Sequence, residues 1–253
     1  MNKVETLVEI LRRLNRGENP EKVRQEAREF IAEVGPEELS RAEQQLMEEG
    51  LESSELAELC EIHMEVLGDH IQDMKAEVPP GHVIHTLVSE HDEILDFLSE
   101  LEEINDRVQQ METFPGQDKG PFGRLSHIAE HLVATEPHHE REEEVLFPEM
   151  EERGITGPPK VMRLEHTQLR EQKKELLELS ESLGAMDFTE FRRRLDLTVS
   201  FIVPVLRDHI FKENNVLYPA ALEVIEDEEV WERMREGCDE IGYCCFTPGQ
   251  ESA

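Results

Sequence analysis

The sequence predicts an all-α protein: an antiparallel four-helix bundle preceded by a small N-terminal helical domain. The composition favours helices, because the 253 residues are rich in Glu and Leu and only 5% of them are aromatic. Apolar residues recur at spacings of three and four through long segments, which is the pattern of amphipathic helices. Residues 138–148 and 209–219 also repeat each other as H-x3-E-x2-V-L-[FY]-P, so we expect two tandem halves of two helices each.

The first 78 residues are expected to form a domain of their own. Apolar positions such as Leu7 and Leu11 mark its first helix, and glycine and proline residues stop the later ones. Residues 78–81, Val-Pro-Pro-Gly, have the composition of a linker to the bundle. The helices expected in this domain cover about residues 3–15, 20–34, 37–49 and 53–75.

The predicted bundle spans residues 82–222. Its second helix is expected to continue past Pro137, and its fourth contains Pro204, which should kink it. A loop rich in Gly and Pro, at 112–121, separates the first two helices, and residues 223–253 form a C-terminal tail with adjacent cysteines. The four helices are expected at about 82–109, from the end of that loop to about 152, at about 159–183 and at about 187–217.

Charge and cysteine content narrow the class of protein. With 26 basic and 59 acidic residues, the formal charge of -33 repels nucleic acid and anionic membranes, so neither is expected as a partner. No segment approaches the roughly 18 consecutive apolar residues of a membrane span, and the N-terminus lacks a signal-peptide pattern. Four cysteines in a chain of this length do not form a disulfide framework. We therefore expect a cytoplasmic protein.

The repeated motifs have the spacing of metal ligands. Residues four apart share a face of a helix, so each H-x3-E copy directs an imidazole and a carboxylate at one point. Each copy is preceded by an E-H-x-x-[IL] motif, at 90–94 and 165–169, whose first histidine lies in the apolar stripe of its helix. Nitrogen and oxygen ligands converging from four helices would hold two metal ions. The predicted ligands are His91, His138, Glu142, His166, His209 and Glu213.

The first copy allows a second choice of ligands, because His138 is followed by His139 and Glu142 by Glu143. Alignment of the two copies on their V-L-[FY]-P ends selects His138 and Glu142. Helix phase read without a break at Pro137 selects His139 and Glu143 instead. We adopt the alignment, because a proline can reset the helix.

Two further groups of residues carry weaker signals. Cys60 and His63 have a C-x2-H spacing that could hold a metal or haem, although packing or capping is the commoner role of so short a motif. Cys238, Cys244 and Cys245 could be redox-active, but adjacent cysteines rarely bond to each other. The sequence alone assigns neither group a function.

Over about residues 82–222 the chain resembles the hemerythrin-type HHE cation-binding domains, and the six predicted ligands match that family's ligand positions one by one. The resemblance implies a four-helix bundle around two non-haem iron ions. Oxygen-carrying hemerythrins have a second histidine one turn after the first in their third helix, where this chain has Arg170. The ligand set is more similar to that of bacterial iron-sulfur-cluster repair proteins that respond to nitric oxide.

The first 75 residues resemble an uncharacterised helical domain found ahead of some HHE domains, on Leu-Asn-Arg-Gly-Glu at 14–18, Glu-Gln-Gln-Leu at 43–46 and Leu-Cys-Glu-Ile-His at 59–63. The two resemblances imply a di-iron protein that binds or senses O2 or NO, or serves cluster repair, with a protein partner at the N-terminal domain. The alternative is a di-iron oxidoreductase: an NO reductase, a peroxidase or an oxidase. A third hypothesis, a helical interaction module with structural histidines, predicts that no metal is bound.

Overall fold

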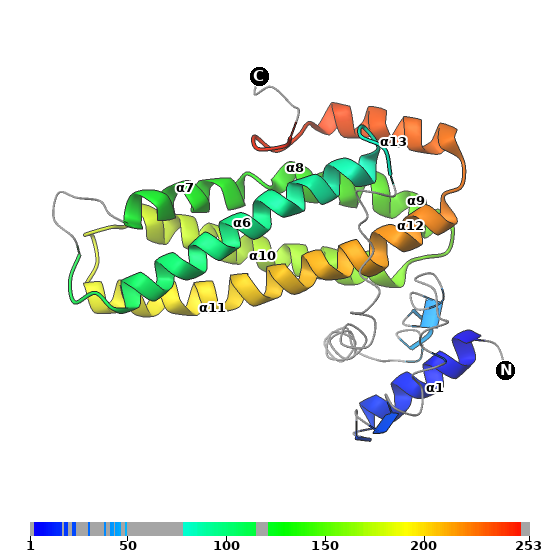
Figure 1. The fold of residues 1–253 in the computed structure, drawn as a ribbon, viewed down its shortest axis with the longest axis horizontal. Helices are drawn as coiled ribbons and strands as arrows, with labels where there is room; N and C mark the ends of the chain where they lie inside the picture. The colour runs from blue at the N-terminus through cyan, green and yellow to red at the C-terminus, as the bar shows by residue number, and fades with distance from the viewer. Residues whose placement is uncertain are drawn as a thin grey trace.

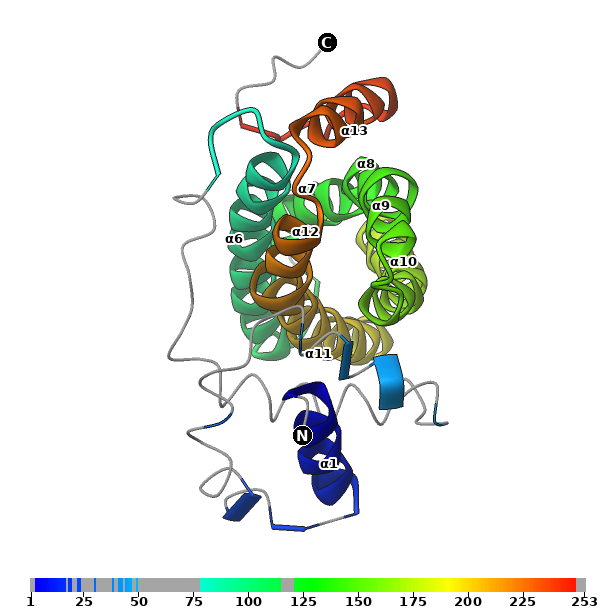
Figure 2. The same ribbon diagram turned by 90° about the vertical axis from the view of Figure 1, so that its right-hand side faces the viewer.

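The computed structural model describes residues 3–16, 78–114 and 121–248, together with 18–19, 22–23, 30, 38, 41–42, 44–46 and 49. Every regular element in these residues is helical, which confirms the predicted all-α fold. Four long helical segments run side by side (Figure 1), and an end-on view shows them around a common interior (Figure 2). They are α6 (Val83–Gln109), α7 (Pro121–Val133) continued by α8 (Glu136–Arg141) and α9 (Phe147–Glu152), α10 (Gly157–Glu181), and α11 (Phe188–Lys212) continued by α12 (Tyr218–Val224).

Side-chain caps fix where two of these helices begin. The Ile84 N–H donates to His82 Nδ1 at the start of α6, with the two nitrogens 3.2 Å apart. At the start of α11, the Asp187 carboxylate accepts the N–H of Thr189 at 2.8 Å and that of Glu190 at 3.3 Å. These bonds satisfy backbone N–H groups that have no partner within the helix. They therefore fix the residue at which each helix begins.

The apolar side chains of the bundle form two clusters, and the inner face of α6 joins both. Leu87 belongs to one cluster and Leu98 to the other, while His91 lies between them and is equally buried. Phe147 and Tyr218 complete the first cluster. A buried polar centre thus lies between two apolar clusters.

The second and fourth segments are less regular than the sequence predicts. The second is interrupted after Val133 and resumes as α8 (Glu136–Arg141), so the predicted continuous helix through Pro137 is wrong. Each segment then contains one π-helical turn, η2 (Glu142–Leu146) or η3 (Glu213–Leu217). The segments end as α9 (Phe147–Glu152) and α12 (Tyr218–Val224).

A proline explains each π-helical turn. Pro148 and Pro219 follow the turns and have no N–H to donate to the carbonyl four residues earlier. The preceding residue instead donates five residues back, from Phe147 to Glu142 in η2 and from Tyr218 to Glu213 in η3. Each turn thus begins at a predicted carboxylate ligand.

The C-terminal region contains a helix that the sequence analysis did not predict, α13 (Glu228–Ile241). It lies along one end of the bundle near α8 (Figure 1). At the other end of the chain, α1 (Lys3–Asn15) provides Leu7 and Val8 to a small apolar cluster that also contacts Val216 of η3.

The helices predicted over 20–34 and 37–49 are described only at single positions, and the one predicted over 53–75 lies outside the described residues, as do Cys60 and His63. Among the helices that the structure describes, none is both long and apolar enough to cross a membrane.

Candidate metal centre

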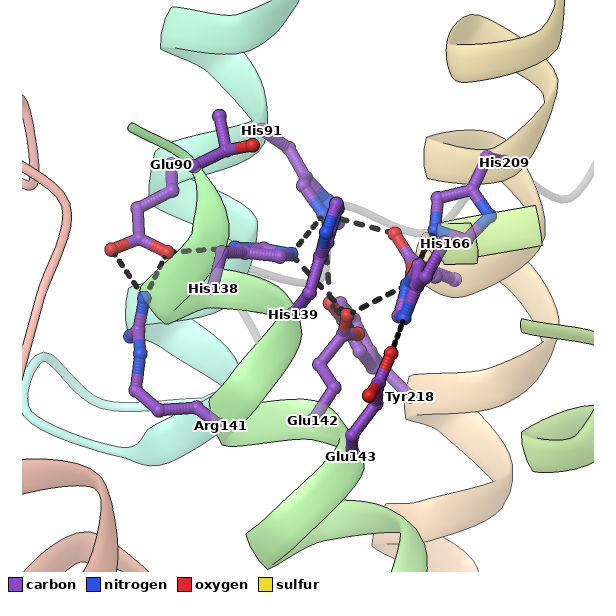
Figure 3. Close-up of polar contacts among 12 residues, drawn as sticks. Glu90, His91, His138, His139, Arg141, Glu142, Glu143, His166, His209 and Tyr218 are labelled. Carbon is purple, nitrogen blue, oxygen red and sulfur yellow. Dashed lines mark hydrogen bonds and ion pairs between the residues drawn. The ribbon is translucent and has the colours of Figure 1, made fainter. Parts of the chain in front are cut away.

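The six predicted ligands converge in the middle of the bundle, and Figure 3 shows most of them with their neighbours. All six are between 0% and 2% exposed, which is rare for histidine and exceptional for glutamate. They come from four different helical segments, so the fold and not one local motif brings them together. They are His91 on α6, His138 on α8, Glu142 at the start of η2, His166 on α10, His209 on α11 and Glu213 at the start of η3.

The four imidazoles form two pairs. His91 Nε2 lies 3.2 Å from His138 Nε2, and His166 Nε2 lies 3.0 Å from His209 Nε2. Two nitrogens that bind one metal ion at about 2.1 Å, at right angles, are separated by roughly 3 Å. Each pair therefore has the spacing of two ligands on one ion, and each pair belongs to one half of the sequence repeat.

The two carboxylates lie between the imidazole pairs. Glu213 Oε1 is 2.7 Å from His209 Nε2, while Glu213 Oε2 is 3.1 Å from His91 Nε2. Glu142 Oε2 lies 3.6 Å from His138 Nε2 and 3.4 Å from His166 Nε2. A carboxylate that reaches both pairs is placed to bridge two ions.

Each imidazole is held from its outer side by an oxygen acceptor. The Nδ1–H groups of His138 and His209 donate to Glu90 and Glu165, each at 2.7 Å. The other two Nδ1–H groups donate to a residue of the opposite half of the repeat. His91 donates to Asn214 Oδ1 at 2.8 Å, and His166 donates to Glu143 Oε1 at 2.7 Å. With Nδ1 occupied, Nε2 is the nitrogen left for a cation, which is the usual arrangement of metal-binding histidines.

The outer acceptors follow the sequence repeat, although the sequence analysis did not assign them. Glu90 and Glu165 directly precede the first histidine of each half, in the E-H-x-x-[IL] motif. Each is in turn paired with a cation that precedes a carboxylate ligand: Arg141 Nη2 lies 2.6 Å from Glu90, and Lys212 Nζ lies 2.5 Å from Glu165. The glutamate of each E-H pair was the signal that could have identified them.

The two halves differ in one aromatic residue. Phe147 lies 6.1 Å from the His166 ring, centroid to centroid, and Tyr218 occupies the repeat-related position 5.7 Å from the His91 ring. The Tyr218 hydroxyl donates to Glu142 Oε1 at 2.8 Å. Burial and the nearby carboxylates raise the pKa of Tyr218, so it remains a hydrogen-bond donor at neutral pH.

Without an ion, the buried carboxylates and imidazoles of the centre shift one another's pKa values. Burial disfavours the charged form of Glu213, but His209, His166 and His91 outweigh it and hold its pKa well below the usual range. Burial likewise opposes protonation of His166, yet the surrounding carboxylates raise its pKa to about 10. The pKa values of His91 and His209 are also raised, because their carboxylate neighbours outweigh burial. In the metal-free protein His166 therefore carries a proton at neutral pH.

These residues fit a pair of metal ions. Among the described residues, the buried side-chain atoms that make no hydrogen bond are Glu142 Oε2, both oxygens of Glu213 and His139 Nδ1. Orphaned buried acceptors are costly unless a cation satisfies them. Four imidazoles with two carboxylates form the mixed nitrogen and oxygen donor set of a non-haem di-iron centre.

The structure also places the alternative choice of ligands. Glu142 faces the centre, whereas Glu143 accepts from His166 on the outer side of the ring. His138 pairs with His91, and His139, which is also buried, stacks on His166 with ring centroids 4.1 Å apart. The helix is interrupted ahead of Pro137, so the phase argument for His139 and Glu143 does not apply, and His138 and Glu142 remain the proposed ligands.

The predicted cysteine group is divided by exposure. Cys238 and Cys244 are buried and Cys245 is exposed, and all three are free thiols. Burial raises the pKa of Cys238 to about 11 and that of Cys244 to about 12, which keeps both protonated and unreactive at neutral pH.

Comparison with known proteins gives consistent matches. The family model of the Hemerythrin HHE cation binding domain matches residues 82–221, and a family of unknown function, DUF438, matches residues 7–73. Iron-sulfur cluster repair protein YtfE of Cronobacter sakazakii is 30% identical over 190 residues, which cover 73% of this chain and 81% of the relative. The protein of the same name from Yersinia pseudotuberculosis serotype IB is 29% identical over 163 residues, or 60% of this chain and 71% of the relative.

Proposed function

Because the chain belongs to the hemerythrin HHE cation-binding family, we propose that it is a non-haem di-iron protein that binds or senses O2 or NO or serves iron-sulfur-cluster repair. The family match confirms the resemblance predicted from the repeated motifs, and the match of residues 7–73 confirms the one predicted for the N-terminal region. The residues proposed to hold the iron are His91, His138, Glu142, His166, His209 and Glu213.

The observation that carries this proposal is the orientation of the donor atoms. Four Nε2 atoms face the interior in two pairs, and three of the four carboxylate oxygens between them, Glu142 Oε2 and both oxygens of Glu213, make no hydrogen bonds. A structural histidine cluster would instead satisfy its polar atoms internally, as buried groups usually do. Two cations between the pairs would satisfy all of these atoms at once.

Two bound iron ions supply redox chemistry and affinity for small diatomic molecules. The protein's contribution is to orient the imidazoles through Glu90, Glu165, Glu143 and Asn214, and to balance the cationic charge with two buried carboxylates. The apolar clusters on both sides exclude water, and Tyr218 places one hydroxyl at the edge of the centre.

A role in iron-sulfur-cluster repair is supported by the names of the relatives, which are 29% and 30% identical to this chain over 163 and 190 residues. The N-terminal region is proposed as the site for a protein partner, since its apolar cluster contacts η3 through Val216. The charge of -33 supports the proposal that nucleic acid and anionic membranes are not partners. Free cysteines at 238, 244 and 245 support a reducing, cytoplasmic location.

The alternative is an oxidoreductase that turns over NO, peroxide or O2 at the same centre. The hydroxyl of Tyr218 favours it, because a phenol that is hydrogen-bonded to Glu142 at the edge of the centre could donate a proton to a substrate bound there. Sustained consumption of the substrate, with an added reductant, separates an enzyme from a protein that binds one equivalent and stops.

The experiment that tests the proposal uses the full chain loaded with Fe(II) without oxygen. We expect two iron ions per chain and an absorption spectrum that changes on addition of NO or O2, with no change in the metal-free control. Cluster repair is tested by mixing the loaded chain with a [4Fe–4S] protein damaged by NO, whose activity should recover only when iron is present. A chain that retains no iron would contradict the proposal. Sustained turnover of NO, peroxide or O2 would instead show that the protein is an oxidoreductase.

A further inference from the structure

The two halves of the bundle are not equivalent beside the centre. In the first repeat copy and on α10, three buried polar residues lie together: Thr135, His139 and Lys173. Lys173 Nζ is 2.6 Å from Thr135 Oγ1 and 3.4 Å from His139 Nε2. The positions related to them by the sequence repeat are Leu206, Ile210 and Leu98, which pack in an apolar cluster.

His139 is the member of this group that reaches the centre. It is 2% exposed, and one of its ring nitrogens lies within 4.8 Å of ligand atoms of His166 and His209. Its ring is nearly parallel to that of His166, with an interplanar angle of 14°. Ile210, at the matching position of the other half, has no atom that can bind a metal.

The outer side of His139 also resembles that of a ligand. His139 Nδ1 makes no hydrogen bond but faces Glu136 Oε2 at 3.9 Å. The neighbouring His166 Nδ1 donates to Glu143, and Arg170 joins the two carboxylates, at 2.7 Å from Glu136 and 3.0 Å from Glu143. A small movement of Glu136 would give His139 the same outer acceptor as the four predicted imidazoles have.

We propose that His139 is a fifth imidazole ligand, which binds through Nε2 the ion that His166 and His209 hold. This rests on the proposed di-iron function and adds a difference between the ions: one has three imidazoles and the other has two. Lys173 Nζ lies beside the same nitrogen, so ligation requires that the ammonium stay with Thr135 Oγ1. The two ions thus differ in charge environment as well as in ligand number.

The test counts ligated imidazoles in the diferrous protein by proton NMR. Each histidine bound to paramagnetic Fe(II) gives one strongly shifted ring N–H signal that exchanges with solvent, and histidine labelled with ¹⁵N identifies the signals. We expect five such signals in the unmodified chain and four in His139→Phe, which keeps the ring stacked on His166 but has no nitrogen.

His131→Phe is the matched control, because His131 is a partly buried histidine of α7 that packs against Phe97 and lies outside the centre. This variant should keep all five signals. Four signals in the unmodified chain would overturn the fifth ligand and leave the di-iron proposal intact, whatever the folding of the variant. Absence of shifted signals from a chain that has taken up no iron would contradict both.

Discussion

Glu165 is the residue through which one half of the centre is held in place. It accepts the His209 Nδ1–H at 2.7 Å and pairs with Lys212, so it fixes both the ring orientation and the nitrogen that faces inward. Glu90 does the same for His138, together with Arg141. Burial opposes ionisation of Glu90, but His138, Arg141 and Thr247 lower its pKa to about 2. The outer carboxylates are therefore charged at every physiological pH.

We predict that Glu165→Gln lowers iron affinity by roughly 10- to 100-fold, because His209 loses its charged acceptor. Competition with a chelator of known affinity measures the change. Glu175→Gln is the matched control, since Glu175 lies on the same helix but pairs with Arg194 at the surface, where it is 31% exposed. Equal affinities of the two variants would show that the outer carboxylate does not support the site.

Proton release should accompany metal binding. The pKa of His166 is raised to about 10 in the metal-free protein, so this imidazole must lose a proton before its Nε2 can bind a cation. The pKa values of His91 and His209 are also raised, so protons compete with a cation for these two imidazoles. We predict that iron loading near pH 7 acidifies a weakly buffered solution and that affinity rises with pH. The stability of the metal-free fold changes with pH in the opposite direction. The raised pKa values stabilise the metal-free fold most below the unfolded histidine pKa of about 6.5, and this contribution is lost as the pH rises towards 10, the folded pKa of His166. A dye-monitored titration without proton release would contradict this charge assignment.

The sequence alone predicted the residues that share a repeated spacing. It could not predict hydrogen bonds between residues of opposite halves of the repeat. His91 and Asn214 are 123 positions apart, and no local pattern links them. Lys173 escaped for a related reason, because an amphipathic pattern gives no sign of a buried cation. By contrast, His138 and Glu142 followed from one alignment of the two copies.

At the scale of elements, the π-helical turns are what direct the carboxylates. Each turn begins at Glu142 or Glu213 and ends before an aromatic residue and a proline. Hydrophobic spacing predicted the long helices but could not reveal a turn with hydrogen bonds five residues back, because the helices that follow, α9 and α12, are too short to show the change of phase. The proline six residues after each glutamate was the physical cue.

We predict that Pro219→Ala lowers iron affinity several-fold, because an N–H at this position allows η3 to relax to α-helix and turn Glu213 away. Helix content by circular dichroism should be unchanged. Pro204→Ala is the control, since Pro204 is exposed in the middle of α11 and far from any π-helical turn. Wild-type affinity in the Pro219 variant would show that packing alone sets the turn.

For the whole molecule, the C-terminal segment completes the enclosure of the centre. Residues after α13 turn back onto the bundle, where the Thr247 hydroxyl donates to Glu90 and Phe246 packs against Phe97 with ring centroids 5.5 Å apart. The N-terminal cluster contacts η3 from another side through Val216. Both ends of the described chain therefore contact elements that carry ligands or their acceptors.

We predict that Thr247→Val lowers the thermal midpoint of the metal-free protein. A hydrogen bond to a buried charge contributes roughly 1.5–3 kcal/mol, and each kcal/mol shifts Tm by roughly 2–4 °C in a domain of this size. Thr167→Val is the control, because its hydroxyl bonds only to a carbonyl of its own helix at an exposed site. Equal midpoints, measured by calorimetry, would show that the C-terminal segment does not support Glu90.

The central claim is that two ions are shared by ligands from both halves of the chain. Iron analysis of the purified, loaded protein tests it most directly, together with His209→Ala and Glu213→Ala. The account predicts two iron ions per unmodified chain, loss of at least one in each variant, and a higher thermal midpoint only when iron is bound. Unchanged iron content in both variants would contradict the account.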